Sequence, residues 1–234
     1  FFSENINNST IILDSMEFRH CIKVMRNNVG DRVSVIDGKG NLYKGKIKII
    51  NRGNCEILID DVIEDYCKKE YYTHIAISPI KNHDRLEWFV EKAIEIGVDE
   101  ISFINCSRTL RKKIKIDRLH RTAIAAIKQT LKAKLPIINN LRNIDDFIEK
   151  CDNDNKFVCH LENEDRKKLF EFKQDIKKHS NNCILIGPEG DFSLDEISML
   201  IDSGFDSITL GDSRLRTETA GVVACNLINS IQNL

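Results

Sequence analysis

The sequence has no apolar run of the roughly 18 residues that a membrane-spanning helix requires. Its opening residues, FFSENINNST, lack the basic start, apolar centre and cleavage site of a secretion signal. The 234 residues include only three prolines, with no long linker, low-complexity tract or internal repeat. Because 41 % of the residues are hydrophobic, the chain can form a substantial core. We therefore expect a soluble, cytoplasmic protein of one large or two modest domains, with no membrane partner.

The sequence also lacks the C-x-x-C spacing of zinc sites and redox motifs. Its eight cysteines are Cys21, Cys55, Cys67, Cys106, Cys151, Cys159, Cys183 and Cys225. Most lie inside apolar runs, and free cysteine is among the most buried residue types. We therefore expect buried free thiols, no disulfides and no metal site. A single catalytic cysteine stays open as an alternative, without a local signature.

Neither G-x-G-x-x-G nor G-x-x-x-x-G-K-[ST] occurs, so the chain has no dinucleotide fingerprint and no P-loop. The net charge of −1 does not indicate a polyanionic partner. The charge is uneven, however, because the segment from Arg108 to Lys134 is basic and contains a single acid, Asp117. This segment is either a phosphate-binding stripe, since neutralised phosphates release counterions, or a solvated helix face.

The first seventy residues alternate short β-like runs with Gly and Asn turns. The runs are RVSVIDG, NLYKGKIKII and NCEILIDDVI. Before them, Phe18 and Cys21 are followed by Ile22 and Met25 at helical spacing. We predict a small β-barrel domain with one helix over residues 1–70.

After a charged segment the pattern changes to alternating strands and helices. THIAISPI predicts a buried strand, and the apolar residues between Leu86 and Ile94 form one helix face. EISFINC, KFVCHLE, NCILIG and SITLG predict further strands with helical segments between them. Such alternation is typical of a mostly parallel sheet with helices on both faces. We predict an α/β domain over residues 73–234.

Two loops at predicted strand ends are the candidate ligand site, because ligands of open α/β sheets bind at the carboxyl ends of the strands. Gly-Pro-Glu-Gly at residues 187–190 follows one strand, and LGDSRLRTETAG at 210–221 follows another. Glycine lets a backbone approach a ligand, and proline fixes one φ. The carboxylate of Glu189 suits a ligand with hydrogen-bond donors or positive charge. An ordinary turn with an exposed Glu stays the alternative.

Two further patterns mark helix starts. Ser193 and Glu196 have the spacing of a capping box and are expected to serve the helix instead of the chemistry. Thr217 or Thr219 is expected to cap the last helix, with Glu218 near its positive end.

LIGPEGDFSLDE and LGDSRLRTETA resemble the two C-terminal signatures of the SPOUT, or trefoil-knot, methyltransferases, specifically the bacterial 16S rRNA uracil-N3 methyltransferases. Residues 20–40 are similar to the family's PUA-like N-terminal segment, and residues 91–109 to the segment that opens its catalytic domain. Gln129 and Pro136 fall in its middle motif. The resemblance therefore spans nearly the whole chain.

The chain departs from the family's usual pattern at three places. Asp191 stands where the family has a second glycine, and Asp-Ser-Arg at 212–214 stands where it has Pro-Arg-Ile. Lys132 is the base nearest to the family's middle-motif arginine. The cofactor loops stay recognisable, whereas the RNA-contacting base is less well defined.

The resemblance implies an α/β fold whose C-terminal SPOUT domain is tied in a trefoil knot, preceded by the PUA-like β-barrel domain. It implies S-adenosylmethionine as the cofactor, bound by three strand-end loops. The implied cofactor-binding residues are Leu161, Ile186, Gly187, Pro188, Glu189, Gly190, Leu210, Gly211, Leu215, Arg216, Thr217 and Ala220.

The implied reaction is methyl transfer to N3 of a uridine in 16S rRNA of the small ribosomal subunit. N3 is largely protonated at neutral pH, so the enzyme must help to remove its proton and align the nucleophile with the methyl group. We expect Arg216 to stabilise negative charge on the uracil carbonyls and Glu189 to accept the proton. An ion pair with Glu218 is the alternative role for Arg216.

Substrate binding and assembly are implied as well. The implied RNA-binding residues are Arg26, Arg108, Arg111, Lys112, Lys113 and Lys132. The target base has to be unpaired or extruded for N3 to be reached. The family implies a homodimer through the final helix, whose apolar face at residues 222–228 equally suits the protein's own core.

Two other functions stay open. One is a trefoil-knot methyltransferase that acts on another RNA or another atom. The other is a non-catalytic RNA-binding protein on the same fold, suggested by Asp191 and by residues 212–214. Binding of S-adenosylmethionine without methylation of RNA would favour the second.

Overall fold

The computed structural model describes residues 1–162, 166–176 and 179–234, and it divides into two compact units. Unit 1 comprises residues 1–68 and 124–135, and unit 2 comprises residues 69–123 and 136–234. Helix α3 (Ile116–Gln129) therefore begins in unit 2 and ends in unit 1. The sequence predicted a first domain over residues 1–70 and did not include residues 124–135. This second segment belongs to unit 1 because it contacts residues 1–68, which are distant from it in the chain.

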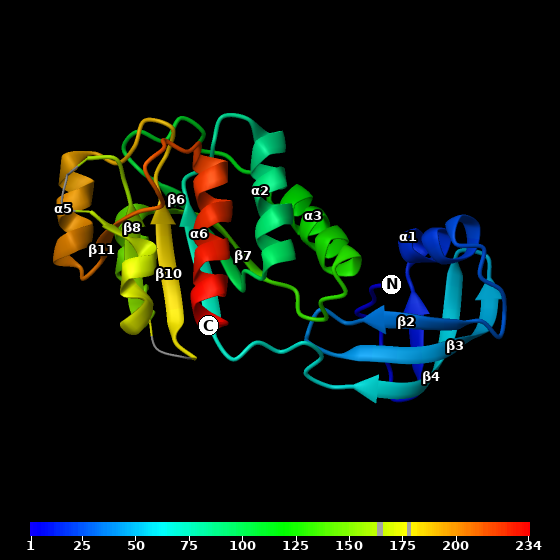
Figure 1. Ribbon diagram of the computed structural model, residues 1–234. Coiled ribbons are helices and arrows are strands. Elements are labelled where there is room, and N and C mark those ends of the chain that lie inside the picture. The colour runs from blue at the N-terminus through cyan, green and yellow to red at the C-terminus, as the bar shows by residue number, and fades with distance from the viewer. Residues whose placement is uncertain (163–165, 177–178) are drawn as a thin grey trace. The chain divides into compact units, whose positions relative to one another are not determined.

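Unit 1 is built on a four-stranded antiparallel sheet in the order β1-β4-β3-β2 (Figure 1). Its strands are β1 (Thr10–Leu13), β2 (Arg32–Ile36), β3 (Leu42–Asn51) and β4 (Asn54–Ile63). Val33 and Val35 are buried, whereas Arg32 before them and Ser34 between them are exposed. This alternation follows from the two-residue period of a strand with one wet face. The predicted β-rich N-terminal fold is confirmed.

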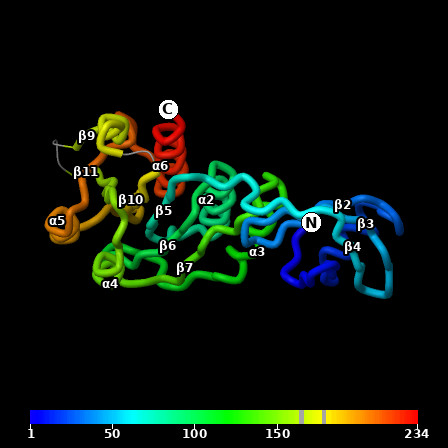
Figure 2. Tube along the Cα trace, turned by 90° about the horizontal axis from the view of Figure 1, so that it is seen from below, coloured from blue at the N-terminus to red at the C-terminus, as the bar shows by residue number. Residues whose placement is uncertain are grey.

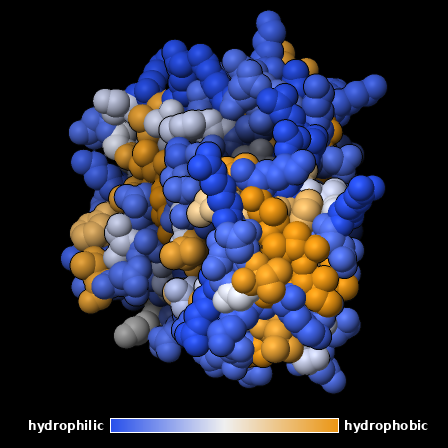
Figure 3. Space-filling model, turned by 90° about the vertical axis from the view of Figure 1, so that its right-hand side faces the viewer, coloured by the Kyte–Doolittle hydropathy of each residue, from blue (hydrophilic) through white to orange (hydrophobic). Residues whose placement is uncertain are grey.

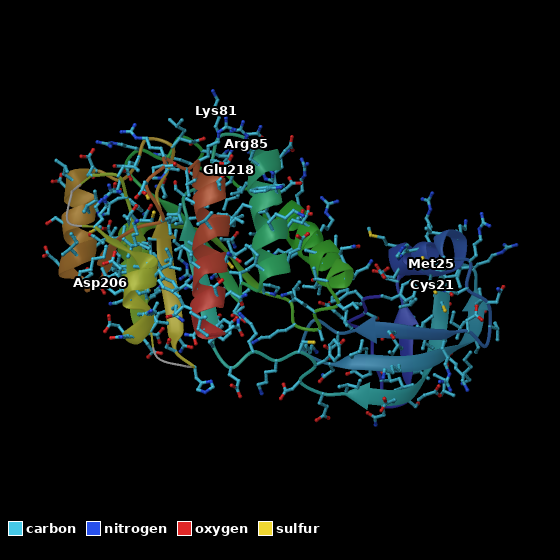
Figure 4. All side chains as sticks on the ribbon, in the orientation of Figure 1. Cys21, Met25, Lys81, Arg85, Asp206 and Glu218 are labelled. Carbon is cyan, nitrogen blue, oxygen red and sulfur yellow. The ribbon has the colours of Figure 1, made fainter. Side chains whose placement is uncertain are left out.

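The helix predicted around Phe18 differs from the expected one. Helix α1 (Ser15–Phe18) continues as the π-helix η1 (Arg19–Val24), and the Met25 amide donates to the His20 carbonyl, five residues back, at 2.9 Å. Cys21 is fully buried, but Met25 is 59 % exposed (Figure 4). The prediction that Cys21 and Met25 share one helix face is wrong, because a π-helix does not keep the 3.6-residue period of an α-helix.

Unit 2 is built on a seven-stranded sheet in the order β7-β6-β5-β10-β8-β11-β9, and each neighbouring pair is parallel. Its strands are β5 (Tyr72–Ile77), β6 (Glu100–Asn105), β7 (Ile137–Asn143), β8 (Asn155–Cys159), β9 (Lys167–Lys168), β10 (Asn181–Ile186) and β11 (Asp206–Thr209). The predicted α/β class with a mostly parallel sheet is confirmed.

Helices cover both faces of this sheet. They are α2 (His83–Ile96), α4 (Ile144–Ile148), the 3₁₀-helix η2 (Leu169–Gln174), α5 (Leu194–Asp202) and α6 (Thr217–Gln232). Helix α6 packs on α2 and on strands β5 and β10, whereas α4 and α5 contribute to a core cluster with Ala76, Val158 and Leu185. Figure 2 shows α6 and α4 on opposite sides of the strands. This arrangement leaves the strand ends open between the loops.

Close packing between α2 and α6 depends on a glycine. A Cβ atom on Gly221 would lie 2.5 Å from the ring of Phe89. No larger residue fits at this point unless the ring moves, so the absence of a side chain sets how closely α6 approaches α2.

Among the described residues, no helix is long and apolar enough to cross a membrane. All eight cysteines are free thiols, and five of them are buried. The expectation of burial is wrong for Cys67, which is exposed in a turn with φ +57° instead of lying in an apolar run. Cys151 and Cys159 are half-buried.

Candidate functional site

The carboxyl ends of three neighbouring strands form the candidate site. Strands β10, β8 and β11 are adjacent and parallel, so the loops that follow Ile186, Cys159 and Thr209 lie at the same edge of the sheet. These loops and the first turns of α2 and α6 line a cavity of about 490 Å³. That volume falls within the range of about 300–1,000 Å³ that is typical of small-molecule sites.

This cavity brings together the predicted cofactor-binding residues, with the exception of Gly190. Those that line it are Leu161, Ile186, Gly187, Pro188, Glu189, Leu210, Gly211, Leu215, Arg216, Thr217 and Ala220. Both predicted catalytic residues are among them. Gly190 lies outside the lining, and a Cβ atom added there would lie 3.5 Å from the Cβ atom of Arg108.

Asp191, the departure from the family's glycine, joins two of the loops. Its backbone has φ +61°, in the left-handed region that favours glycine, and its amide donates to the Pro188 carbonyl at 2.9 Å. One carboxylate oxygen accepts from the Leu161 amide at 2.8 Å, and the other accepts from the Phe192 amide at 2.9 Å. The aspartate therefore adds a link between the loops after β8 and β10 that glycine cannot supply.

Glu189 is tied to the loop that follows β5. Its Oε1 atom accepts from the backbone amide of Lys81 at 3.0 Å, and the residue is exposed. One of its two carboxylate oxygens is thus engaged in holding a neighbouring loop.

The end of β6 supports the Gly-Pro-Glu-Gly loop from the other side. The guanidinium of Arg108 donates to the carbonyls of Gly190 at 2.8 Å and Phe192 at 3.2 Å. Arg108, predicted to bind RNA, therefore holds the Gly-Pro-Glu-Gly loop in the structure.

The predicted capping box of α5 is present. Ser193 and Glu196 hydrogen-bond each other's backbone amides, and Glu196 also accepts from Ser107, through its amide at 2.6 Å and its hydroxyl at 2.9 Å. Burial raises the pKa of Glu196, but these hydrogen bonds outweigh burial and hold the pKa below its usual value. Glu196 therefore fastens the start of α5 to the end of β6.

The start of α6 presents Arg216 and Glu218 to the cavity. Arg216 is the N-cap residue, and no side chain caps the helix, so the predicted threonine cap is wrong: Thr217 already lies within the first turn. Over the described ranges, the exposed Arg216 side chain makes no hydrogen bond or ion pair. Glu218 pairs instead with Arg85 of α2, at 3.7 Å between Oε1 and Nη1 (Figure 4).

Two further titratable groups in the cavity, Cys159 and His160, are in their neutral forms at neutral pH. Burial raises the pKa of Cys159 to about 12, which leaves the thiol protonated and unreactive. Burial also lowers the pKa of His160, against the opposing charge of Asp191, and its Nε2 atom lies 3.0 Å from the Ser207 hydroxyl. Within the part of the chain that the structure describes, no three His, Cys, Asp or Glu side chains are grouped to hold a metal ion. The cavity suits an organic ligand that carries apolar surface and charged groups of both signs, because its lining has four arginines and four carboxylates.

Sequence reasoning did not assign a site role to Arg85 or Asp191, and it gave Glu218 only a helix-dipole role and an alternative role as the ion-pair partner of Arg216. Arg85 follows the end of β5 by eight residues, so the strand-end rule was the available signal. Asp191 directly follows the loop motif and was noted only as a departure. The pairing of Arg85 with Glu218 had no local signal, because 133 positions separate them in the chain.

The basic segment has several roles. Arg118 pairs with Glu87 at 2.5 Å and with Asp84 at 3.1 Å, and Lys128 pairs with Glu17. Residues 110–115, which we call the basic loop, instead line a second, more open cavity together with Lys81. The basic loop contains three predicted RNA-binding residues, Arg111, Lys112 and Lys113.

The remaining predicted RNA-binding residues lie in unit 1. Arg26 is exposed and has φ +59°, at the point where the chain leaves η1. Lys132 is half-buried and lies after α3, in the second segment of the unit.

Two family models match the chain. A model described as an RNA methyltransferase domain matches residues 67–229. A model described as an RNA methyltransferase PUA domain matches residues 13–60.

Curated relatives named ribosomal RNA small subunit methyltransferase E align over most of their length. The relative from Mesomycoplasma hyopneumoniae is 30 % identical over 229 residues, which cover 95 % of this chain and 95 % of the relative. The relative from Rickettsia conorii is 28 % identical over 219 residues, which cover 93 % of this chain and 88 % of the relative.

Solved structures with the same fold also match. A probable rRNA-methyltransferase from Porphyromonas gingivalis is 35 % identical with a TM-score of 0.92, covering 100 % of this chain and 98 % of its own. The ribosomal RNA small subunit methyltransferase E from Neisseria gonorrhoeae, bound to S-adenosyl methionine, is 23 % identical with a TM-score of 0.85 and covers 98 % of this chain and 96 % of its own. At that lower identity the likeness concerns the fold.

Proposed function

This chain belongs to the RNA methyltransferase family, whose domain model covers residues 67–229, and we propose that it transfers a methyl group from S-adenosylmethionine to N3 of a uridine in 16S ribosomal RNA. The observation that supports this most is the single cavity at the ends of β10, β8 and β11, which gathers loop residues from three distant parts of the sequence. Relatives along nearly the whole chain are named as methyltransferases of small-subunit ribosomal RNA.

The cavity fits S-adenosylmethionine by its size and its donor set. Apolar side chains of Leu161, Ile186 and Leu210 offer surface for the adenine ring, and backbone groups at Gly187 and Gly211 are open to approach. The lining carries four carboxylates and four arginines, which suits a ligand that, like this cofactor, carries both positive and negative charge. When bound, this cofactor supplies the methyl group. The trefoil knot implied by the family is part of the same proposal.

Arg216 is proposed to stabilise the uracil during transfer. Its guanidinium lines the cavity without an ion-pair partner in the described chain, so it is available to the uracil carbonyls as negative charge develops there. Glu189 is proposed to contribute to cofactor binding through its loop. Because its Oε1 atom accepts from the Lys81 amide, its other carboxylate oxygen is one candidate for accepting the N3 proton.

RNA is proposed to bind along the basic loop, with further contacts from Arg26 and Lys132 in unit 1 and from Arg108. The four bases of the loop and Lys81 are close in space, which suits contact with successive phosphates. A homodimer is proposed through α6, on which Val222, Val223 and Leu227 are half-buried, while Ile228 is in the core.

The experiment that tests this function uses small ribosomal subunits from a strain that lacks the enzyme. The subunits are incubated with the purified protein and labelled S-adenosylmethionine, and the nucleosides of the rRNA are analysed by mass spectrometry. Labelled 3-methyluridine is the expected product. Cofactor binding in calorimetry without this product would replace the proposal with a different RNA target or with a non-catalytic RNA-binding protein.

A further inference from the structure

Glu218 is a nearly buried carboxylate whose hydrogen-bonding capacity is mostly unused. Its side chain is 8 % exposed, and it lines the cavity from the first turn of α6. Its one polar contact within the described residues is the 3.7 Å ion pair with Arg85, and it accepts no hydrogen bond there. Buried carboxylates in proteins normally accept several hydrogen bonds, so a partner from a ligand is expected at this position.

The other three carboxylates of the cavity are exposed or already engaged. Glu189 accepts from the Lys81 amide, and both oxygens of Asp191 accept backbone amides. Glu189 is also exposed, so water competes for its free oxygen, and Asp212 is exposed and pairs with Lys168. Among these four carboxylates, Glu218 combines burial with free acceptor positions.

The groups around Glu218 match one edge of uracil. That edge presents a carbonyl oxygen, the N3–H donor and a second carbonyl oxygen, so its complement is a carboxylate accompanied by hydrogen-bond donors. Arg85 and Arg216 supply guanidinium donors to the same cavity as Glu218. Positive charge at the carbonyls also favours the deprotonated form of uracil and so makes N3 more acidic.

From this arrangement we infer that Glu218 is the catalytic residue that accepts the N3 proton of the target uridine, an inference that rests on the proposed methyl transfer to N3. The N3–H bond breaks, its proton bonds to a Glu218 oxygen, and the electron pair stays in the ring plane on N3, while the negative charge is shared with both carbonyl oxygens through the π system. The proton must leave first, because the methyl group bonds to the same in-plane electron pair. That pair then bonds to the methyl carbon, the sulfur keeps the pair of the broken C–S bond, and Glu218 releases its proton to water.

The test substitutes Glu218→Gln, which keeps the shape of the side chain and removes its charge and basicity. At pH 7 we expect kcat for 3-methyluridine formation to fall by about 100-fold or more, the range of general-base contributions. The loss should shrink as the pH rises and more N3 ionises in solution. It should also shrink with RNA that contains 5-fluorouridine, since fluorine makes N3–H more acidic.

Two measurements separate this role from a structural one. The affinity for S-adenosylmethionine in calorimetry and the thermal midpoint of Glu218→Gln should stay close to wild type. The matched control is Asp206→Asn, an exposed carboxylate at the other end of strand β11, which should leave activity unchanged (Figure 4). A loss in Glu218→Gln that is equal at all pH values, or that accompanies lost cofactor affinity, overturns the inference.

Glu189→Gln tests the competing assignment. If this variant shows the pH-dependent loss and Glu218→Gln does not, the proton acceptor is Glu189. If the wild-type protein forms 3-methyluridine and Glu218→Gln forms it at the same rate, the inference alone fails. If the wild-type protein forms none, the proposed function fails and the inference falls with it.

Discussion

Glu218 of unit 2 differs from the buried carboxylates of unit 1 and from Glu196 of its own unit, which accepts hydrogen bonds from Ser107 and Ser193. In unit 1, Asp37 accepts the backbone amides of residues 39–41 at 2.7–3.1 Å, and Glu17 pairs with Lys128 and accepts the Phe2 amide. In unit 2, Glu218 has only its ion pair with Arg85. A carboxylate saturated by its own chain stabilises a turn or a junction, whereas one left with open acceptor positions beside a cavity is available to a ligand.

The surfaces of the units differ as well. Unit 1 exposes the large apolar side chains of Met16, Val24, Met25 and Val29, around α1 and η1. Figure 3 shows hydrophobic side chains gathered on the face of the molecule that it presents. Unit 2 exposes apolar side chains as well, among them Leu110 and Leu194, but it also has the cavity at the strand ends, whose lining includes the exposed Glu189 and Arg216 and the nearly buried Glu218. A charge in the buried part of this lining is screened less by water than a charge on the surface.

The largest effect that we expect comes from Arg216→Ala in unit 2. Removing a preorganised donor from the developing charge should lower kcat by about 100-fold or more, while cofactor affinity and thermal midpoint stay near wild type. Nucleoside mass spectrometry and calorimetry measure the two quantities. Arg52→Ala, in the exposed β3–β4 turn of unit 1, is the matched control. Unchanged turnover in Arg216→Ala would remove this arginine from catalysis.

Charge reversal in the basic loop compares the units as RNA-binding surfaces. The triple variant Arg111→Glu, Lys112→Glu and Lys113→Glu should weaken RNA binding and flatten the plot of log affinity against log salt by about three units, one for each lost phosphate contact. Arg26→Glu in unit 1 should change the slope by about one unit. Fluorescence anisotropy at several salt concentrations gives both slopes. An unaltered slope in the triple variant would make the basic loop a solvated surface.

Two glycine substitutions test packing in each unit. A Cβ atom on Gly45 would lie 2.3 Å from the Leu58 carbonyl oxygen of the neighbouring strand, whereas one on Gly221 would lie 2.5 Å from the Phe89 ring. Both Gly→Ala variants should lose about 1–3 kcal/mol of unfolding free energy in urea. The loss should be larger at Gly45, because a backbone carbonyl yields less than a side chain. Equal urea midpoints for wild type and Gly45→Ala would contradict this prediction, because they would show that β3 and β4 move apart around the new methyl group without loss of unfolding free energy.

The smallest expected effect is a difference in acid sensitivity. Burial lowers the pKa of His74 in unit 2 below 6.5, although Glu100 opposes the shift. The unfolded chain then binds a proton that the folded chain does not, so unit 2 loses stability as the pH falls below 6.5, by at most about 1.4 kcal/mol per pH unit. His160 adds to this loss with the same sign.

Asp37 of unit 1 responds in a lower pH range. Burial raises its pKa, but the hydrogen bonds from Asn41 and Lys39 outweigh burial and hold the pKa below 3.8. Its stabilisation is therefore present above pH 3.8 and is lost below that value.

The measurement for His74 is urea unfolding followed by the fluorescence of Trp88 in α2, the single tryptophan. The free energy of unfolding should fall between pH 7 and pH 5, and His74→Asn should reduce this fall. An identical dependence in the variant would contradict the role of His74.

The sequence alone determined the class of each unit and the loops that carry the site. Strand alternation around Val33, the helix face from Leu86 to Ile94 and the two C-terminal signatures are local patterns, because neighbouring side chains set strand and helix periods. The sequence did not predict strands β1 and β7, because β1 has only four residues and β7 contains polar residues between Asn139 and Asn143. Each is stabilised as a strand by its pairing partner, β4 for β1 and β6 for β7.

Only the tertiary structure decided which side chains face one another at the site. The order β5-β10-β8-β11 brings Leu161 to Asp191, Lys81 to Glu189 and Arg85 to Glu218. Each of these pairs joins loops or helices that follow different strands, so no spacing in the sequence encodes the contact. The same is true of the burial of Glu218, which depends on how closely α6 packs on α2 at Gly221. Strand order and close packing are properties of the whole chain, and they convert residues of ordinary local character into a site.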